Sequence, residues 1–228
     1  MKDSQLILYH GSLELVPFPL PERGNPHNDY GPGFYCTTHL ELAEEWSCRG
    51  QEFGVVNEYR LDVSELKTLN LSGREYNILN WLAVLLENRV FDISLPIPAA
   101  NREYILENFL PDYKSYDLIK GHRADDSYFS YARDFLNNSI SLSQLQRAMR
   151  LGRLGEQVVL RSEKAFGAIE FVKPHAVDGR IYFAKRMSRD SDARKDYRAI
   201  RTEVLSGEEI LAIDIRRQNW KNDDPRLR

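Results

Sequence analysis

The sequence predicts an α+β fold, in which short strands near both ends of the chain enclose a helical region. Three observations indicate this class: β-rich runs occur at both ends, apolar residues at helical spacing dominate the middle, and no repeat or low-complexity linker divides the chain. The length of 228 residues, 42% of them hydrophobic, fits one large domain or two small ones.

The first quarter of the chain reads as strand, loop, strand, helix and strand. The run "LILYHGS" at residues 6–12 is β-rich and ends in Gly-Ser, so it is expected to be a buried strand that enters a turn. After a Gly-Pro-Gly turn, "GFYCTT" at residues 33–38 predicts a second strand. Residues 39–50 have helical spacing and end in glycine, and residues 55–63 alternate like a strand.

The rest of the chain is expected to hold helices in its middle and strands toward its end. A basic stretch at residues 180–201 also contains acidic residues, which favours a solvated, ion-paired helix. The other expected elements are an apolar helix at 76–90, a helical region at 101–153, strands at 157–162 and 168–173, and a last strand at 209–217.

Composition restricts the compartment and the class of protein. The formal net charge of −3 argues against a protein that coats nucleic acid with its whole surface. Two cysteines, Cys36 and Cys48, suffice for neither a zinc site nor a disulfide framework, so no metal is expected and a reducing compartment is favoured. No apolar signal sequence or membrane-length apolar run is found, which predicts a cytoplasmic protein without a membrane partner.

Four motifs occur in a fixed order along the chain: "YHGS", "YGPGFYCTTHLELAEEW", "YDLIKGHRADD" and "GEQVVLRSEKAFGAIEF". With these motifs the chain resembles the bacterial DUF3990 family over residues 6–171, and that family looks like a branch of the ADP-ribosyltransferase superfamily. Within that superfamily, the chain resembles the branch of diphtheria toxin and the poly(ADP-ribose) polymerases. The site residues of that branch follow the order His, Tyr, Glu along the sequence. The first two positions fall on His10 and Tyr35, and the third on Glu156 or Gln157.

The resemblance implies a split antiparallel β-sandwich that holds NAD as co-substrate in the cleft between its halves, with a helical insertion. Residues 1–175 would form this domain, and residues 176–228 would be an extension packed on it. His10 would bond the ribose hydroxyls, Gly11 would present its backbone to the nicotinamide, and Tyr35 would stack on the ring. The residues expected to bind NAD are His10, Gly11, Ser12, Tyr30, Gly31, Gly33, Phe34 and Tyr35.

The third position of the pattern leaves two alternatives open. Breaking the bond between nicotinamide and ribose builds positive charge on the sugar, so a carboxylate such as Glu156 suits the chemistry. The residue that matches the family best is Gln157, whose amide could still anchor the ribose. Adjacent residues of a strand point to opposite faces, so Glu156 and Gln157 cannot both serve. His10, Tyr35, Glu156 and Gln157 are the candidate catalytic residues.

The resemblance implies transfer of a single ADP-ribose unit to a macromolecular acceptor, either protein or nucleic acid. It is typical of bacterial toxins, some of which are neutralised by an antitoxin protein. NAD hydrolysis is one alternative, and an inactive binding module is another. Tyr182, Phe183 and Tyr197 in the basic stretch could then hold nucleic acid. Residues 147–155, which precede the third motif position, are expected to meet the acceptor.

Overall fold

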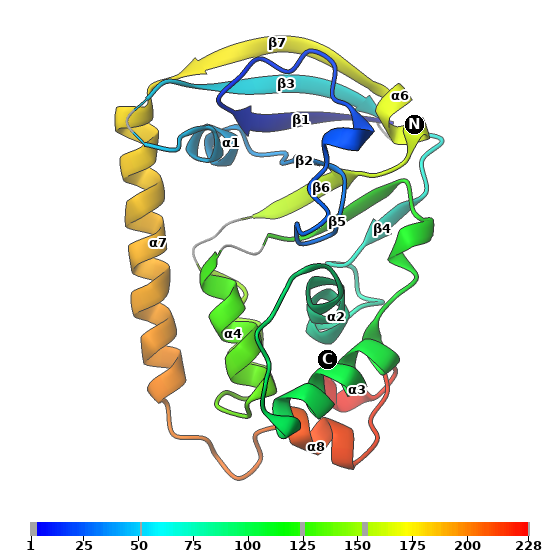
Figure 1. Ribbon diagram of the computed structural model, residues 1–228, viewed down its shortest axis with the longest axis vertical. Helices are drawn as coiled ribbons and strands as arrows, with labels where there is room; N and C mark the ends of the chain where they lie inside the picture. Colours follow the sequence, from blue (N-terminus) through cyan, green and yellow to red (C-terminus); the bar gives the residue numbers. More distant parts are fainter. Residues whose placement is uncertain (1–3, 51, 124–125, 152–154, 228) are drawn as a thin grey trace.

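The computed structural model describes residues 4–50, 52–123, 126–151 and 155–227. Within them, seven strands form two sheets (Figure 1). The first sheet has the order β1-β3-β7 and is antiparallel throughout. Its strands are β1 (Gln5–Ser12), β3 (Gly54–Asp62) and β7 (Ile169–Val177). Alternating buried residues along β3 agree with the strand pattern of the sequence.

The second sheet has the order β2-β6-β5-β4, in which only the β4–β5 pair is parallel. Its strands are β2 (Phe34–Cys36), β6 (Glu156–Leu160), β5 (Leu118–His122) and β4 (Thr68–Asn70). One antiparallel bridge connects the sheets: Tyr9 N donates to Thr37 O over 2.8 Å, and Thr37 N donates to Tyr9 O over 2.9 Å. β1 and β2 are therefore neighbours across the junction of the two sheets.

The two faces of the second sheet bury different side chains. Phe34, Val158 and Leu160 face the first sheet and pack with Leu8 and Tyr59. The other face carries Val159 and Ile119 against a helical layer. This alternation follows from the two-residue period of a strand, and it decides which candidate site residues share a face.

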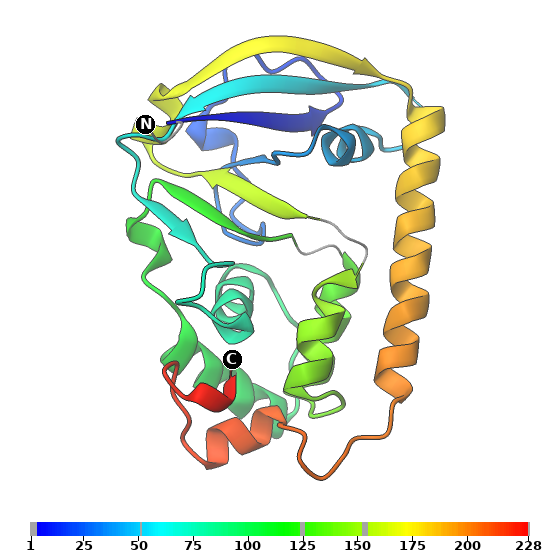
Figure 2. The same ribbon diagram turned by 180° about the vertical axis from the view of Figure 1, so that it is seen from behind.

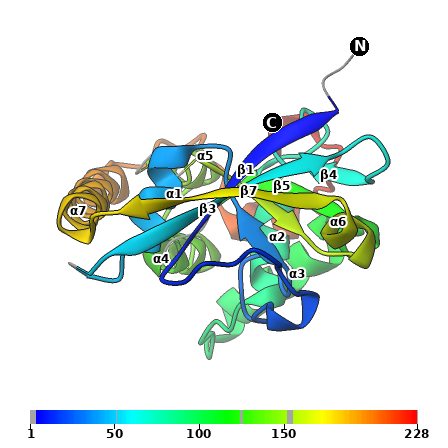
Figure 3. The same ribbon diagram turned by 90° about the horizontal axis from the view of Figure 1, so that it is seen from above.

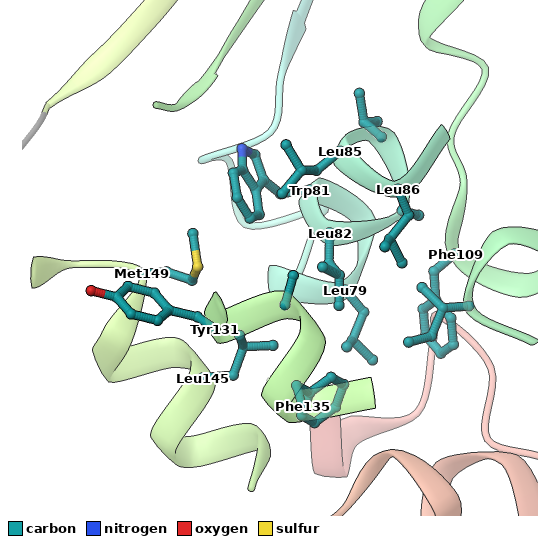
Figure 4. Close-up of a cluster of buried hydrophobic side chains, with 14 of the residues drawn as sticks. Leu79, Trp81, Leu82, Leu85, Leu86, Phe109, Tyr131, Phe135, Leu145 and Met149 are labelled. Atoms are coloured by element: carbon teal, nitrogen blue, oxygen red, sulfur yellow. The ribbon is translucent and has the colours of Figure 1, made fainter. Parts of the chain in front are cut away.

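The helical layer is built around α2 (Ile78–Asn88), which is buried on nearly all sides (Figure 4). A capping box between Asn77 and Asn80 starts this helix, and its apolar sequence explains why other helices surround it. These are α3 (Pro96–Phe109), α4 (Asp126–Leu136), α5 (Leu142–Ala148) and α8 (Ala212–Arg217). Short elements complete the fold: α6 (Glu163–Gly167) and the 3₁₀ turns Pro21–Arg23, Tyr113–Ser115 and Pro225–Leu227.

Two further helices lie beside the first sheet. The helix α1 (Leu40–Ser47) packs on β1 and β3, and the long helix α7 (Gly179–Thr202) runs from α1 to the helical layer along one edge of the molecule (Figures 1 and 2). Arg189 of α7 bonds the buried Glu45 of α1 over 2.7 Å. The view from above shows α7 standing at the end of the sheet away from α6 (Figure 3). The expected ion-paired helix at 180–201 is thus present.

Two sequence-based expectations are wrong. Residues 101–153 are not helical throughout, because β5 lies among them and pairs with both β4 and β6. Its "LIKGH" sequence is too short and too polar to signal a strand alone, and its pairing partners are distant in the sequence. Residues 209–217 do not form a strand, because Ala212 and Ile215 are buried at helical spacing in α8. The start expected for the extension, residue 176, lies inside β7.

No helix within the described ranges combines the length and the apolar character that crossing a membrane requires. Cys36 and Cys48 are both buried free thiols, and burial raises the pKa of Cys36. The fold is thus a mixed α/β structure with two sheets, and its candidate site residues gather at the junction of those sheets.

Candidate functional site

Three neighbouring strands carry the candidate catalytic residues. His10 lies near the end of β1, Tyr35 lies in β2, and β6 begins with Glu156 and Gln157. The bridge at Tyr9 aligns β1 with β2, and the register of β2 with β6 pairs Tyr35 with Val159. The fold therefore brings the three motif positions together although they are far apart in the sequence.

His10 is oriented by the backbone of β2. Its Nδ1 donates to the carbonyl oxygen of Tyr35 over 2.7 Å, and its ring lies 4.4 Å from the Phe34 ring, centroid to centroid. Burial lowers the pKa of His10, and the bond to Tyr35 only partly opposes this effect. The imidazole is thus neutral at pH 7, and because a carbonyl can only accept, Nδ1 carries the proton. Nε2 is left as an acceptor suited to a hydroxyl group.

The stability of the protein is expected to fall as the pH is lowered from 7 to 5. Burial lowers the pKa of His10 and of His122, so in this window the unfolded chain binds more protons than the folded one. Each histidine contributes a slope of at most about 1.4 kcal/mol per pH unit. Urea unfolding of the wild type and of His10→Gln at several pH values measures this effect. A slope that is the same in both proteins would contradict the assignment to His10.

The Gly-Pro-Gly turn before β2 is held by Tyr35 itself. The Tyr35 hydroxyl donates to the carbonyl oxygen of Gly31 over 2.6 Å and accepts from the backbone N of Tyr30 over 3.1 Å. Gly31 has a φ of +75°, a conformation that favours glycine. A Cβ on Gly33 would lie 2.7 Å from the carbonyl oxygen of Leu160, so the glycine lets the turn lie directly on β6.

Tyr30 is a packing residue in this structure. Its side chain is only 1% exposed, its hydroxyl donates to the carbonyl oxygen of His122, and it accepts from Nε1 of Trp81 over 2.8 Å. A Cβ on Gly121 would lie 2.4 Å from this hydroxyl, so the missing side chain makes room for it. Tyr30 therefore fixes the turn to β5 and α2 and presents no open ring face.

The other residues expected to bind NAD also have contacts within the protein. A Cβ on Gly11 would lie 2.1 Å from the carbonyl oxygen of Ala43, so this glycine allows α1 to pack on β1. The Ser12 hydroxyl accepts from Nδ2 of Asn57 over 3.0 Å. Phe34 packs between the sheets. These contacts position the strand ends around His10.

Glu156 and Gln157 point to opposite faces of β6, as strand geometry requires. Gln157 shares the face of Tyr35, is 6% exposed, and places its Nε2 3.5 Å from Asp29. Its Oε1 has no hydrogen-bond partner among the described residues. Glu156 lies on the other face, one third exposed, and pairs with Lys120 over 2.7 Å. Burial raises the pKa of Glu156, but hydrogen bonds from Lys120 and Ser72 outweigh it and lower the pKa overall.

The structure also reveals residues that the motifs did not identify. Asp29, 3% exposed, receives two bonds from the Arg89 guanidinium at the end of α2, at 2.9 and 2.7 Å. The pairing of Lys120 with Glu156 was not predicted, because β5 was not expected to be a strand. On α1, the Trp46 ring lies 3.9 Å from the Arg123 guanidinium. No local sequence signal predicts these pairs, since their partners meet only through the sheet order.

Two cavities lie in this region of the fold, and neither of them is lined by His10, Tyr35 or Glu156. One of about 530 Å³ is lined by residues beside His10 and Glu156, namely Tyr9 and Gly155, and by the start of α1. The other, of about 470 Å³, is lined by Ser72, Trp81 and His122 on the far side of Glu156. No group of three His, Cys, Asp or Glu side chains suited to a metal occurs in the part of the chain that the structure describes. Of residues 147–155, positions 152–154 lie outside it.

The sequence pattern of the family described as "Protein of unknown function (DUF3990)" matches residues 6–171, which is nearly three quarters of the chain. The chain, a mixed α/β protein with two sheets, therefore belongs to the DUF3990 family. No curated protein and no solved structure matches it.

Proposed function

We propose that this protein transfers a single ADP-ribose unit from NAD to a macromolecular acceptor. The observation that carries the proposal is that β1, β2 and β6, which carry His10, Tyr35 and Glu156, are neighbouring strands at the junction of the two sheets. These residue types match the His-Tyr-Glu pattern that the sequence resembles. The two sheets, bridged at Tyr9 and Thr37, also support an ADP-ribosyltransferase-like split sandwich as the fold.

In this proposal each residue has a different role. The neutral His10, with its proton on Nδ1, accepts a ribose hydroxyl at Nε2. Tyr35 points to the opposite face of the sheet from Glu156, and it acts by holding the Gly-Pro-Gly turn on β6 and by orienting His10 through its carbonyl oxygen. Glu156 is the carboxylate that stabilises the positive charge on the ribose as the nicotinamide leaves. We assign Glu156 rather than Gln157 because Glu156 is charged and accessible, whereas Gln157 is buried under the turn.

The ion pair of Glu156 with Lys120 favours transfer of one unit over chain growth. Elongation requires a base that activates a ribose hydroxyl for the next addition. Because its hydrogen bonds lower the pKa of Glu156, this carboxylate is a weak base. Incubation of the purified protein with NAD labelled in its adenylate and with cell lysate tests the proposal. Label in discrete species of protein or nucleic acid is expected. Polymer ladders would contradict single-unit transfer, and free ADP-ribose alone would indicate NAD hydrolysis.

NAD is expected to raise the melting temperature of the wild-type protein through mass action. At a hundred times the dissociation constant, the added stability is about 2.7 kcal/mol. His10→Ala and Tyr35→Ala should each lose most of this shift, whereas the exposed His27→Ala should keep it. Differential scanning fluorimetry with and without NAD measures the effect. If both site variants kept the full NAD-dependent rise in melting temperature, His10 and Tyr35 would not belong to the binding site.

A further inference from the structure

The helices α4 and α7 lie side by side (Figures 1 and 2). A cavity lined with arginine lies between them. The buried seam between them contains Tyr131 and Tyr197, whose ring centroids lie 3.8 Å apart, and the Tyr197 hydroxyl donates to Asp134 over 2.7 Å. Beside this seam the cavity measures about 520 Å³. Its charged lining residues, here called the arginine groove, are Arg133, Asp134, Arg194, Arg198 and Arg201.

The arginines of α7 form a row along one side of the helix. Arg194, Arg198 and Arg201 follow the spacing i, i+4 and i+7, which keeps them on one face over about 10 Å. Asp192 and Asp196 point the other way and line a separate cavity beside α1. The side of α7 that faces the arginine groove is thus mainly basic, whereas the side beside α1 carries Lys185 and Arg189 as well as Asp192 and Asp196.

The arginine groove carries more positive than negative charge. Arg201 pairs with Asp134 over 3.2 Å, and Arg194 pairs with Asp190 of the same helix over 3.0 Å. No ion pair of Arg133 or Arg198 occurs among the residues that the structure describes. Two carboxylates thus face four guanidinium groups, and like charges gathered around one cavity repel unless an anion lies between them.

The geometry points to a single-stranded nucleic acid as the ligand of the arginine groove. Arginine binds phosphate with its planar fork, and a row of guanidinium groups along a helix suits a chain that carries a phosphate on every unit. The tyrosine rings of the seam are buried against each other, so the exposed lining of the groove consists mainly of guanidinium groups, which suit the phosphate backbone. Binding is therefore independent of base sequence.

The position of the groove connects it to the candidate site. The helix α4 begins at Asp126, four residues after His122, and His122 is paired with Glu156 across β5 and β6. A nucleic-acid strand that lies along α4 is thus directed toward Glu156. We infer, on the basis of the proposed function, that this nucleic acid is the acceptor of ADP-ribose.

The salt dependence of binding tests the groove without NAD. The probe is a fluorescein-labelled, 20-nucleotide single-stranded RNA of mixed sequence, and anisotropy gives its affinity at 50 and 200 mM salt. Four phosphate contacts predict a loss of affinity of about 50-fold between the two conditions. The double variant Arg133→Gln, Arg198→Gln removes two contacts, so its loss should be about 7-fold, with weaker binding at both salt concentrations.

A control variant carries the same change of charge away from the groove. Lys173→Gln combined with Lys164→Gln alters one exposed residue of β7 and one exposed residue of α6. This control should bind RNA with the salt dependence of the wild type. The arginine groove would not be the RNA-binding site if the two double variants had equal RNA affinity and salt dependence, or if the wild type showed no salt-dependent binding. Equal binding of a 20-residue poly-glutamate peptide would overturn phosphate recognition.

The acceptor role has a separate readout. With labelled NAD and the unlabelled RNA, wild-type protein should place label in the RNA, and the groove variant should place less. The acceptor role alone would be overturned if the protein bound RNA without labelling it but labelled protein when cell lysate was added to the same assay. RNA binding with no label in any macromolecule would instead refute the proposed transferase function and leave the groove in place.

Discussion

Replacing Glu156 by glutamine is expected to reduce ADP-ribose transfer by about 10²–10³-fold. A group fixed opposite a developing charge contributes this much when it is preorganised, and the ion pair with Lys120 holds the Glu156 carboxylate in place. Glutamine keeps the shape and removes the charge. Because the loss arises in the transition state, the affinity for NAD should change little. Initial rates with labelled NAD, combined with the NAD-dependent shift in melting temperature, separate the two effects.

Two other residues, Gln157 and Glu163, provide the controls. Gln157→Ala should lower stability, since the buried amide contacts Asp29, but folded protein should retain most of its activity. Glu163→Gln changes an exposed carboxylate on α6 and should have no effect on the rate. Full activity of Glu156→Gln, or a larger loss of activity in folded Gln157→Ala, would show that the residues have been assigned in the wrong order.

Replacing Arg89 by alanine is expected to lower the free energy of unfolding by about 3 kcal/mol. The substitution takes two bonds from the buried Asp29 carboxylate, which lies in the loop before the Gly-Pro-Gly turn. The value is at the lower end of the range for buried pairs because a quarter of the Arg89 side chain is exposed. Urea unfolding gives the difference, and Arg217→Ala, on the surface of α8, should change stability by less than about 0.5 kcal/mol.

A double-mutant cycle shows whether the effect belongs to the pair. Asp29→Asn, Arg89→Met and their combination should give a coupling energy of about 1–3 kcal/mol. The combined variant should be more stable than the sum of the single changes predicts, since it leaves no charge on either side. Additive effects would mean that Arg89 stabilises α2 without Asp29.

Elements with a strong local pattern were predictable, and elements defined by distant partners were not. The strand β1 and the apolar helix α2 have clear periodicity, and both were expected at the correct places. The strand β5 contains Lys120 and Gly121, whose polar or absent side chains are explained only by Glu156 and Tyr30 on other elements. The segment at 209–217 has apolar residues that suit either period, and packing in the helical layer selects the helix α8.

The same limit applies to the candidate site. The family resemblance implied that His10, Tyr35 and the start of β6 belong to one site, and the sheet order makes the strands that carry them neighbours. It could not predict which of Glu156 and Gln157 lies under the turn, because that depends on the register of β2 and β6. Gly11 and Gly33 illustrate a further gap: their lack of a side chain suits a ligand or a close backbone, and here α1 and β6 occupy that space.

The helical layer that packs on the second sheet is completed by residues that follow the segment matched by the family, which ends at residue 171. Ile215, Trp220 and Leu227 are buried in the same cluster as α2, although the match ends at residue 171. During synthesis on a ribosome, both sheets have all their strands when β7 has emerged, but the support of β5 and β6 still lacks these side chains. The order of synthesis thus separates assembly of the strands that carry His10 and Glu156 from the moment at which the layer behind them becomes rigid.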